Sequence, residues 1–220
     1  MLLIVLMIVG GVTNPSTGNV MAISTHLKKI TSLPVVHRKD FADLLDELEN
    51  TRSRNLGIGD FLEFVKMVWP AFIEGGHHRI MADAFNRIAE GDLKRLIINM
   101  PPRHTKSEFA SHLFPAWYLG KYPDRKVIQT AHTAELAVGF GRKVRNLVGS
   151  YDYQEIFPDV SLSTDSKAAG RWNTNHKGDY FAIGVGGAVT GKGADILIVD
   201  DPHSEQEAAQ NDPSVYDRTY

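Results

Sequence analysis

The sequence predicts an α/β fold, in which a mostly parallel sheet is covered by helices on both faces and preceded by a helical lead-in. Short apolar runs of strand length, such as 96–100 and 196–199, alternate with longer stretches that have helical apolar spacing. Alternating strands and helices favour parallel sheets, because a helix normally connects two parallel strands. Apolar runs without polar alternation also indicate strands that are buried on both faces.

Residues 1–38 are predicted to be an apolar and flexible lead-in to a domain that spans 39–220. The segment 1–12 is apolar apart from glycines, but it is shorter than the roughly 17–25 residues that span a bilayer. It also lacks the basic start of a secretory signal. The segment fits a buried strand, an unstructured tail or a leader ahead of a start at Met21. We favour the last two and expect no membrane anchor.

Three helices are predicted ahead of the first strand of the domain. An amphipathic helix is expected over 40–49, followed by a break over 51–59. Asp60 is expected to cap a second helix, which ends before Pro70. A third helix is expected over about 79–90, where apolar residues recur at helical spacing.

Strands and helices alternate after this point. The helix over 133–148 is expected to bury Leu136, Phe140, Val144 and Leu147. The predicted elements, in order, are a strand over 96–100, a helix from 108, a strand over 126–131, a helix over 133–148, a hairpin near Trp172 and 180–183, and a strand over 196–199.

Two segments compete as the phosphate-binding loop. The glycine-rich loop (residues 186–192) matches the pattern G-x-x-x-x-G-K, whereas the Lys106 loop (residues 100–107) lacks both glycines. A phosphate loop needs a strand before it and a helix after it, because N–H groups at the helix start bind the anion. The Lys106 loop has this context. The glycine-rich loop is followed by Gly193 and a strand, so we interpret it as a turn between strands.

The residue types around the Lys106 loop suit phosphate and metal chemistry. Lys106 is expected to reach the phosphates, and Ser107 offers a hydroxyl to Mg²⁺. The strand over 196–199 ends in two carboxylates. Asp200 is expected to hold Mg²⁺ through water, and Asp201 to orient or deprotonate the attacking water. Taken alone, the pair also fits an acidic turn after a buried strand.

Together these motifs resemble the large terminase subunit of tailed bacteriophages. Residues 97–108, which read Ile-Ile-Asn-Met-Pro-Pro-Arg-His-Thr-Lys-Ser-Glu, are similar to the phosphate loop of that family, and 114–117, 185–195 and 198–203 continue the match. The resemblance runs from about Phe61 to the C-terminus. It implies a P-loop ATPase that uses ATP and Mg²⁺ to drive double-stranded DNA into an empty phage head.

The resemblance also implies roles for individual residues. Lys106, Arg103 and Asp201 would be catalytic, with Arg103 acting as an arginine finger in cis rather than facing solvent. Ser107 and Asp200 would hold the metal. The nucleotide-binding residues implied by the resemblance are Pro102, Arg103, His104, Thr105, Lys106, Ser107 and Glu108.

Further expectations follow from the family alone. They are double-stranded DNA, the portal protein and the small terminase subunit as partners, a homo-oligomeric ring during packaging, and a location in the host cytoplasm. The chain ends before the family's next ATPase motif and its nuclease domain. We therefore interpret it as the N-terminal part of a terminase ATPase and expect no nuclease activity.

Thr105 is a departure from the family, which usually has glycine there. If this position needs a positive φ, a β-branched residue would be strained. Thr105 and the early C-terminus therefore favour an alternative, a nucleotide-binding or assembly module that does not hydrolyse ATP. A helicase-like ATPase on the same fold is the other alternative. The net charge of −2 gives no overall basic field, so DNA contacts would be local.

Overall fold

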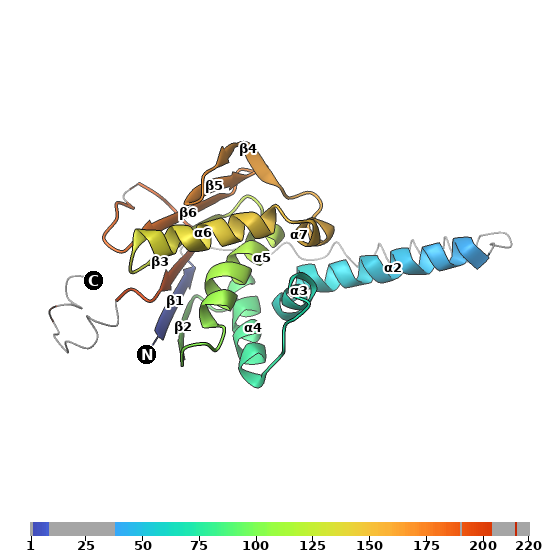
Figure 1. The fold of residues 1–220 in the computed structure, drawn as a ribbon, viewed down its shortest axis with the longest axis horizontal. Coiled ribbons are helices and arrows are strands. Elements are labelled where there is room, and N and C mark those ends of the chain that lie inside the picture. The colour runs from blue at the N-terminus through green and yellow to red at the C-terminus, as the bar shows by residue number, and fades with distance from the viewer. Residues whose placement is uncertain (1, 9–37, 190, 204–213, 215–220) are drawn as a thin grey trace.

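The computed structural model describes residues 2–8, 38–189, 191–203 and 214. A twisted sheet carries helices on one side, and helix α2 extends away from this body (Figure 1). The helices are α2 Arg38–Gly59, α3 Phe61–Val68, α4 Gly76–Ala89, the π-helical segment η1 Glu108–Leu113, α5 Phe114–Lys121, α6 Ala134–Val148 and α7 Tyr151–Ile156.

The described strands form a seven-stranded sheet in the order β2-β1-β7-β3-β6-β5-β4. The pairings of β3 with β6 and β7 are parallel, and the other described pairings are antiparallel. The predicted α/β class is correct, but the prediction of a mostly parallel sheet is wrong, because this sheet is mixed. The strands are β1 Leu2–Ile8, β2 Arg95–Met100, β3 Lys126–Ala131, β4 Leu162–Lys167, β5 Arg171–Thr174, β6 Asp179–Gly184 and β7 Ile196–Asp200.

Strand β1 accounts for part of this difference. It lies antiparallel between β2 and β7, where Ile4 pairs with Ile98 on one side and Asp200 on the other. Of the three alternatives for the apolar segment, the structure has the strand over 2–8. The two alternatives that we favoured, a tail or a leader, are therefore wrong for 2–8. The rest of the predicted lead-in, over 9–37, lies outside the described residues. The remaining antiparallel pairings belong to the meander β4-β5-β6.

Helix α2 continues through the break that was predicted over 51–59, so that prediction is wrong. The segment contains no proline, and its end is anchored by a tertiary contact. Trp117 Nε1 donates a 2.9 Å hydrogen bond to the Gly57 carbonyl, one of the last carbonyls of the helix, which lack a partner within it. Tertiary packing has overridden the weak helix propensity of the glycine-containing end.

The next two helices agree with the sequence interpretation. The Asp60 carboxylate accepts a 3.0 Å hydrogen bond from the Glu63 N–H and caps α3. Helix α3 ends ahead of Pro70, as predicted. Helix α4 begins at Gly76 rather than near Arg79, and ends just before Gly91, whose φ is 84°.

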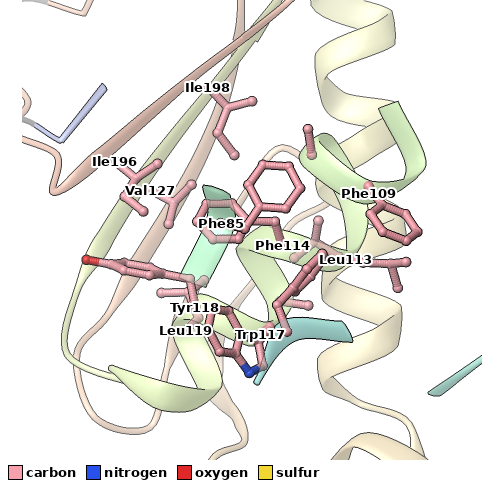
Figure 2. Close-up of a cluster of buried hydrophobic side chains, with 14 of the residues drawn as sticks. Phe85, Phe109, Leu113, Phe114, Trp117, Tyr118, Leu119, Val127, Ile196 and Ile198 are labelled. Atoms are coloured by element: carbon pink, nitrogen blue, oxygen red, sulfur yellow. The ribbon is translucent and has the colours of Figure 1, made fainter. Parts of the chain in front are cut away.

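The core lies between the helices and one face of the sheet. Figure 2 shows Phe114 and Tyr118 close to Val127 and Ile196 of the central strands. Phe114 and Ile196 are fully buried, and burial of a side chain of this size contributes about 1.5–3 kcal/mol. The ring of Phe61 packs within this cluster and against Phe64, Phe85, Phe109, Phe114 and Trp117.

Helices α5 and α6 cover the same face of the sheet. Tyr180, Val127 and Ile196 are register partners across β6, β3 and β7, so their side chains share one face. A Cβ added to Gly141 of α6 would meet Tyr180 on this face, and Tyr118 of α5 lies beside Val127 and Ile196 (Figure 2). Within the described chain, the expectation of helices on both faces is therefore not met.

Helix α6 buries Val144, as predicted, but not Leu136, Phe140 or Leu147, which are exposed or only half-buried. Its buried residues are Ala137, Gly141, Val144 and Val148, whereas Leu136 is 53% exposed. Small residues let the helix approach the sheet closely. Trp172 Nε1 donates a 3.2 Å hydrogen bond to the Gly141 carbonyl. The apolar periodicity alone favoured the larger side chains.

Candidate active site

The Lys106 loop connects β2 to a helix, as predicted. Strand β2 ends at Met100, a turn follows, and helical residues begin at Lys106 and continue through η1 into α5. Strand β2 is not buried on both faces, because it is at the edge of the described sheet and Ile97 is 61% exposed. The order of strand, turn and helix nevertheless directs the first N–H groups of the helix toward the loop.

Two residues without glycine's freedom have a left-handed backbone in this loop. The φ angles are 63° at Arg103 and 60° at Thr105. Thr105 therefore meets the condition set out above, because a β-branched residue is strained at a positive φ. Such a conformation costs on the order of 1–3 kcal/mol and persists where the surroundings over-determine it.

The structure brings Lys106 to both carboxylates of the Asp200-Asp201 pair. The Lys106 Nζ atom lies 2.7 Å from Asp201 Oδ1 and 3.5 Å from Asp200 Oδ1. Lys106 and Asp201 are 95 positions apart in the sequence, and the Lys106 side chain is 4% exposed. A buried ammonium needs such partners. The same charge is available to the phosphates of a nucleotide.

Asp200 is held by two hydroxyl groups from the helix after the loop. Ser107 Oγ donates to Asp200 Oδ1 over 3.2 Å, and Ser111 Oγ donates to Oδ2 over 2.7 Å. Burial raises the pKa of Asp200, while the bond from Ser111 and the charge of Lys106 act in the opposite direction. The sequence analysis assigned Ser107 and Asp200 to one metal site, and the structure places their side chains in direct contact.

Ser111 was missed by the sequence interpretation. It is fully buried, and it lies one helical turn after Ser107, so both hydroxyls reach the same carboxylate. The signal in the sequence is the spacing of the two serines, read together with a buried acid elsewhere in the chain.

Ser107 and Asp200 fit a magnesium site by the chemistry of their donors. Mg²⁺ prefers oxygen ligands and is usually held by one or two carboxylates, water and substrate phosphates rather than by a cage of side chains. Among the described residues no group of three or more His, Asp or Glu side chains forms such a cage. Asp200 with a neighbouring hydroxyl offers the smaller set that suits a metal bound together with a nucleotide.

Asp201 follows Asp200 in the chain but lies in a different environment. Its side chain is 28% exposed, its φ is 44°, and its carbonyl accepts a 3.1 Å hydrogen bond from the His132 N–H. The last contact fixes the turn after β7 against the end of β3. Asp201 thus presents a carboxylate at the rim of the site, where water can reach it.

The other predicted loop residues occupy more exposed positions. Arg103 and His104 are both exposed, and His104 Nδ1 donates a 2.9 Å hydrogen bond to the Pro102 carbonyl. Glu108 pairs with His112 at 2.5 Å and with Lys143 at 3.1 Å. These pairings, chiefly the hydrogen bond with His112, lower the pKa of Glu108 to about 2. The Glu108 carboxylate therefore joins the loop helix to α6.

The glycine-rich loop occupies a different place. It connects β6 to β7, and the element that directly follows it is this strand, so the prediction of a turn between strands is confirmed. Gly186 and Gly191 have φ angles of 80° and 79°. Lys192 Nζ lies 3.8 Å from the centre of the Phe181 ring. Phe181 alternates with Tyr180, so the Lys192 ammonium packs on the face opposite the helices.

No helix in the described residues is both long enough and apolar enough to cross a bilayer. No protein-family model matches the chain, and no solved structure matches it significantly.

One relative among curated proteins agrees with the resemblance of the motifs. The chain is 27% identical over 146 residues to the terminase large subunit of Enterobacteria phage T3. The match covers 65% of this chain and 25% of that relative, so the chain spans only part of the length of the phage protein. This identity, together with the loop and its two carboxylates, makes the chain a distant relative of a phage terminase large subunit.

Proposed function

We propose that the chain is the ATP-hydrolysing motor part of a phage terminase large subunit, which powers the packaging of double-stranded DNA into the procapsid. The observation that carries the proposal is the 2.7 Å contact between Lys106 and Asp201. This contact joins the loop that follows β2 to the carboxylate that follows β7. Phosphate-loop enzymes need a phosphate-binding lysine and a carboxylate that acts on water within one site.

Each residue of the site has a task in this proposal. Lys106 exchanges its carboxylate partners for the phosphates, and the first N–H groups of its helix bind the same anion. Ser107 and Asp200 hold Mg²⁺, which neutralises charge on the phosphates. Asp201, released by Lys106, accepts a hydrogen bond from the attacking water and takes its proton. Arg103, on the exposed side of the loop, reaches the charge that develops on the transferred phosphoryl group.

The proposal extends to the partners of a packaging motor. Double-stranded DNA, the portal protein, the small terminase subunit, a homo-oligomeric ring and the host cytoplasm are proposed on the distant relation to the phage T3 protein. Because the net charge is −2, contacts with DNA phosphates must come from local groups of basic residues.

The test compares the two lysines that compete for the phosphate. Purified chain is expected to release phosphate from ATP in the presence of Mg²⁺, and Lys106→Ala is expected to abolish this release. Lys192→Ala is the matched control, because it removes the same charge from the glycine-rich loop. Undiminished turnover in Lys106→Ala, or loss of turnover in Lys192→Ala alone, would reject the assignment of the loop.

A nucleotide-binding or assembly module that does not hydrolyse ATP is the second candidate. It is favoured by the strained φ of 60° at Thr105 and by the ion pair that occupies Lys106. A carboxylate that is paired with Lys106 is not free to take a proton from water, so the ion pair opposes hydrolysis without excluding a bound nucleotide. A titration that gives saturable binding of ATP and Mg²⁺ without release of product would support this candidate over the motor.

A further inference from the structure

A buried histidine contacts the strained residue of the Lys106 loop. His78, in the first turn of α4, is 5% exposed, and its Nε2 atom lies 2.7 Å from Thr105 Oγ1. The two residues are 27 positions apart in the sequence. None of the tasks proposed for Lys106, Ser107 or the two carboxylates uses this histidine.

The hydrogen bonds around His78 fix the direction of the contact. The Gly75 N–H donates a 2.8 Å bond to His78 Nδ1, so Nδ1 carries no proton and Nε2–H is the donor. Thr105 Oγ1 therefore accepts from His78 and donates its own proton to the His104 carbonyl over 2.6 Å. The chain of bonds runs from Gly75 through the imidazole and the threonine hydroxyl into the loop backbone.

Packing holds the imidazole in the orientation that this chain requires. The His78 ring stacks on Phe109, with centroids 4.9 Å apart, and meets Phe72 edge-on at 4.8 Å. Phe72 lies in the segment before α4, and Phe109 belongs to the helix after the loop, so the ring is held between these two segments. Burial, with a smaller contribution from His77, lowers the pKa of His78, which agrees with a neutral ring that donates from Nε2.

We propose that His78 is a positioning residue for the phosphate loop, which holds Thr105 in the left-handed conformation that glycine adopts without strain. The inference rests on the proposed function, because it gives the loop a ligand. A threonine at this position is more stable at negative φ, and rotation to that region turns the following N–H groups away from their common target. The hydroxyl held by His78 opposes this rotation.

This interpretation makes Thr105 and His78 a functional pair rather than two independent residues. Glycine at 105 has no hydroxyl to hold and needs no support at positive φ. The histidine is therefore needed only when residue 105 has a side chain. A purely structural histidine, which packs on Phe72 and Phe109, would be needed with either residue.

A double-mutant cycle separates these two roles. His78→Phe keeps a ring of similar shape but removes both nitrogens. With Thr105 present, it is expected to weaken binding of ATP and Mg²⁺ about tenfold, because the loop loses one buried hydrogen bond. In the Thr105→Gly background the same change is expected to alter the dissociation constant by less than about twofold. An equal loss in both backgrounds would overturn the proposal.

Two conservative variants identify the nitrogen that matters. His78→Gln places an amide N–H near the position of Nε2 and is expected to recover most of the affinity. His78→Asn places its amide near Nδ1, where it can meet Gly75 but not Thr105, and is expected to bind as weakly as His78→Phe. Recovery by Asn and not by Gln would contradict the contact with Thr105.

A readout without nucleotide tests the loop itself. In the nucleotide-free chain, His78→Phe is expected to accelerate hydrogen exchange at the amides of Thr105 and Lys106 about tenfold, because it frees the loop to open. This acceleration should be absent in the Thr105→Gly background. Unchanged exchange in His78→Phe would show that the histidine does not hold the loop, whatever its effect on ATP binding.

Failure of the inference is distinguishable from failure of the proposed function. Turnover that survives Lys106→Ala rejects the function, whatever the result at residue 78. If Lys106→Ala is inactive but the effect of His78→Phe is the same with threonine or glycine at 105, the function stands and the positioning role of His78 is wrong.

Discussion

The Lys106 loop and the glycine-rich loop differ in which residues adopt a positive φ and in which element follows the loop. The glycine-rich loop has glycines where the chain takes a positive φ, at Gly186 and Gly191, and it leads into strand β7 inside the sheet. The Lys106 loop takes the same kind of backbone angle at Arg103 and Thr105 without any glycine. It leads into a buried helix whose serines hold Asp200.

If the Lys106 loop binds phosphate as proposed, the comparison teaches that glycine is the more replaceable part of such a loop. Thr105 has a positive φ, and its Oγ1 atom lies 2.7 Å from His78 Nε2, the contact that we propose maintains this angle. The start of a helix cannot be replaced in this way, because its N–H groups are the ligands. The Gly-x-x-x-x-Gly-Lys pattern specifies the glycines, which can be replaced. The start of the helix, which cannot be replaced, is indicated only by the strand before the loop and the helix after it.

The largest effect is expected at Asp201, compared with Asp195 at the other end of β7. Asp201→Asn removes the proposed base and should lower ATP turnover about 10²–10⁴-fold. It also removes the 2.7 Å partner of Lys106, so ATP affinity should be retained or rise. Steady-state kinetics and a binding titration measure the two quantities separately.

Asp195→Asn is the control for this prediction. Asp195 follows the glycine-rich loop and accepts hydrogen bonds from Arg125 at 2.9 Å and from the Lys126 N–H at 2.8 Å. Its substitution should reduce stability and leave turnover in place. If both aspartates affected turnover equally, the two ends of β7 would not differ in the way described above.

A smaller effect is expected at Ser111, whose hydroxyl donates to Asp200 over 2.7 Å inside the core. Ser111→Ala leaves a buried carboxylate oxygen without this donor, which costs about 1–3 kcal/mol. Urea unfolding of the variant and the native chain gives the difference in the free energy of unfolding. An unchanged free energy would mean that water replaces the hydroxyl and that the helix does not hold the carboxylate.

The glycine-rich loop should respond to backbone changes through stability alone. Gly191 has a φ of 79°, and a Cβ added there meets no atom within 4 Å. Gly191→Ala should therefore cost about 1–2 kcal/mol from the backbone angle only, and ATP turnover should persist. Gly193→Ala is the matched control, because its Cβ also meets nothing and its φ is not positive. Equal destabilisation by both would contradict the conformational explanation.

The smallest expected effect is the loss of stability at acidic pH that comes from the ion pairs of Glu108. The pKa of Glu108 is lowered from 4.5 to about 2, so its ion pairs contribute stability above the unfolded pKa and lose it as the pH falls through this window. The pair is partly exposed to solvent, and the contribution is therefore only about 0.2–1 kcal/mol. Thermal unfolding of Glu108→Gln and the native chain should differ at pH 6 and converge near pH 2. A constant difference would assign the effect to packing.

Local patterns predicted the elements around the site but not its full architecture. The strand before Lys106, the helix after it and the strand that ends at Asp200 are all present. Each depends on neighbours in the sequence, through apolar spacing and capping. The placement of Ser107 near Asp200 agrees with their assignment to one site, and their proposed role in binding Mg²⁺ stays a prediction.

The missed features depend on contacts between distant residues. Neither the pairing of Ile4 with Asp200 nor the contact between His78 and Thr105 leaves a pattern within a short window. The buried stripe of α6 was misassigned because Gly141 contributes to packing by being small. Apolar periodicity identifies large apolar side chains. It does not identify small residues that bury a helix face by letting the helix approach the sheet closely.

Strand β1 is synthesised long before β7, one of its two partner strands. Its residue Ile4 pairs with both Ile98 and Asp200, yet the ribosome makes β7 last of the described strands. At about 5–20 residues per second, β7 follows β1 by about 10–40 s. During that interval an apolar strand lacks one neighbour and is prone to aggregation. Chaperone protection of 2–8 should therefore matter most before Asp200 and Asp201 emerge.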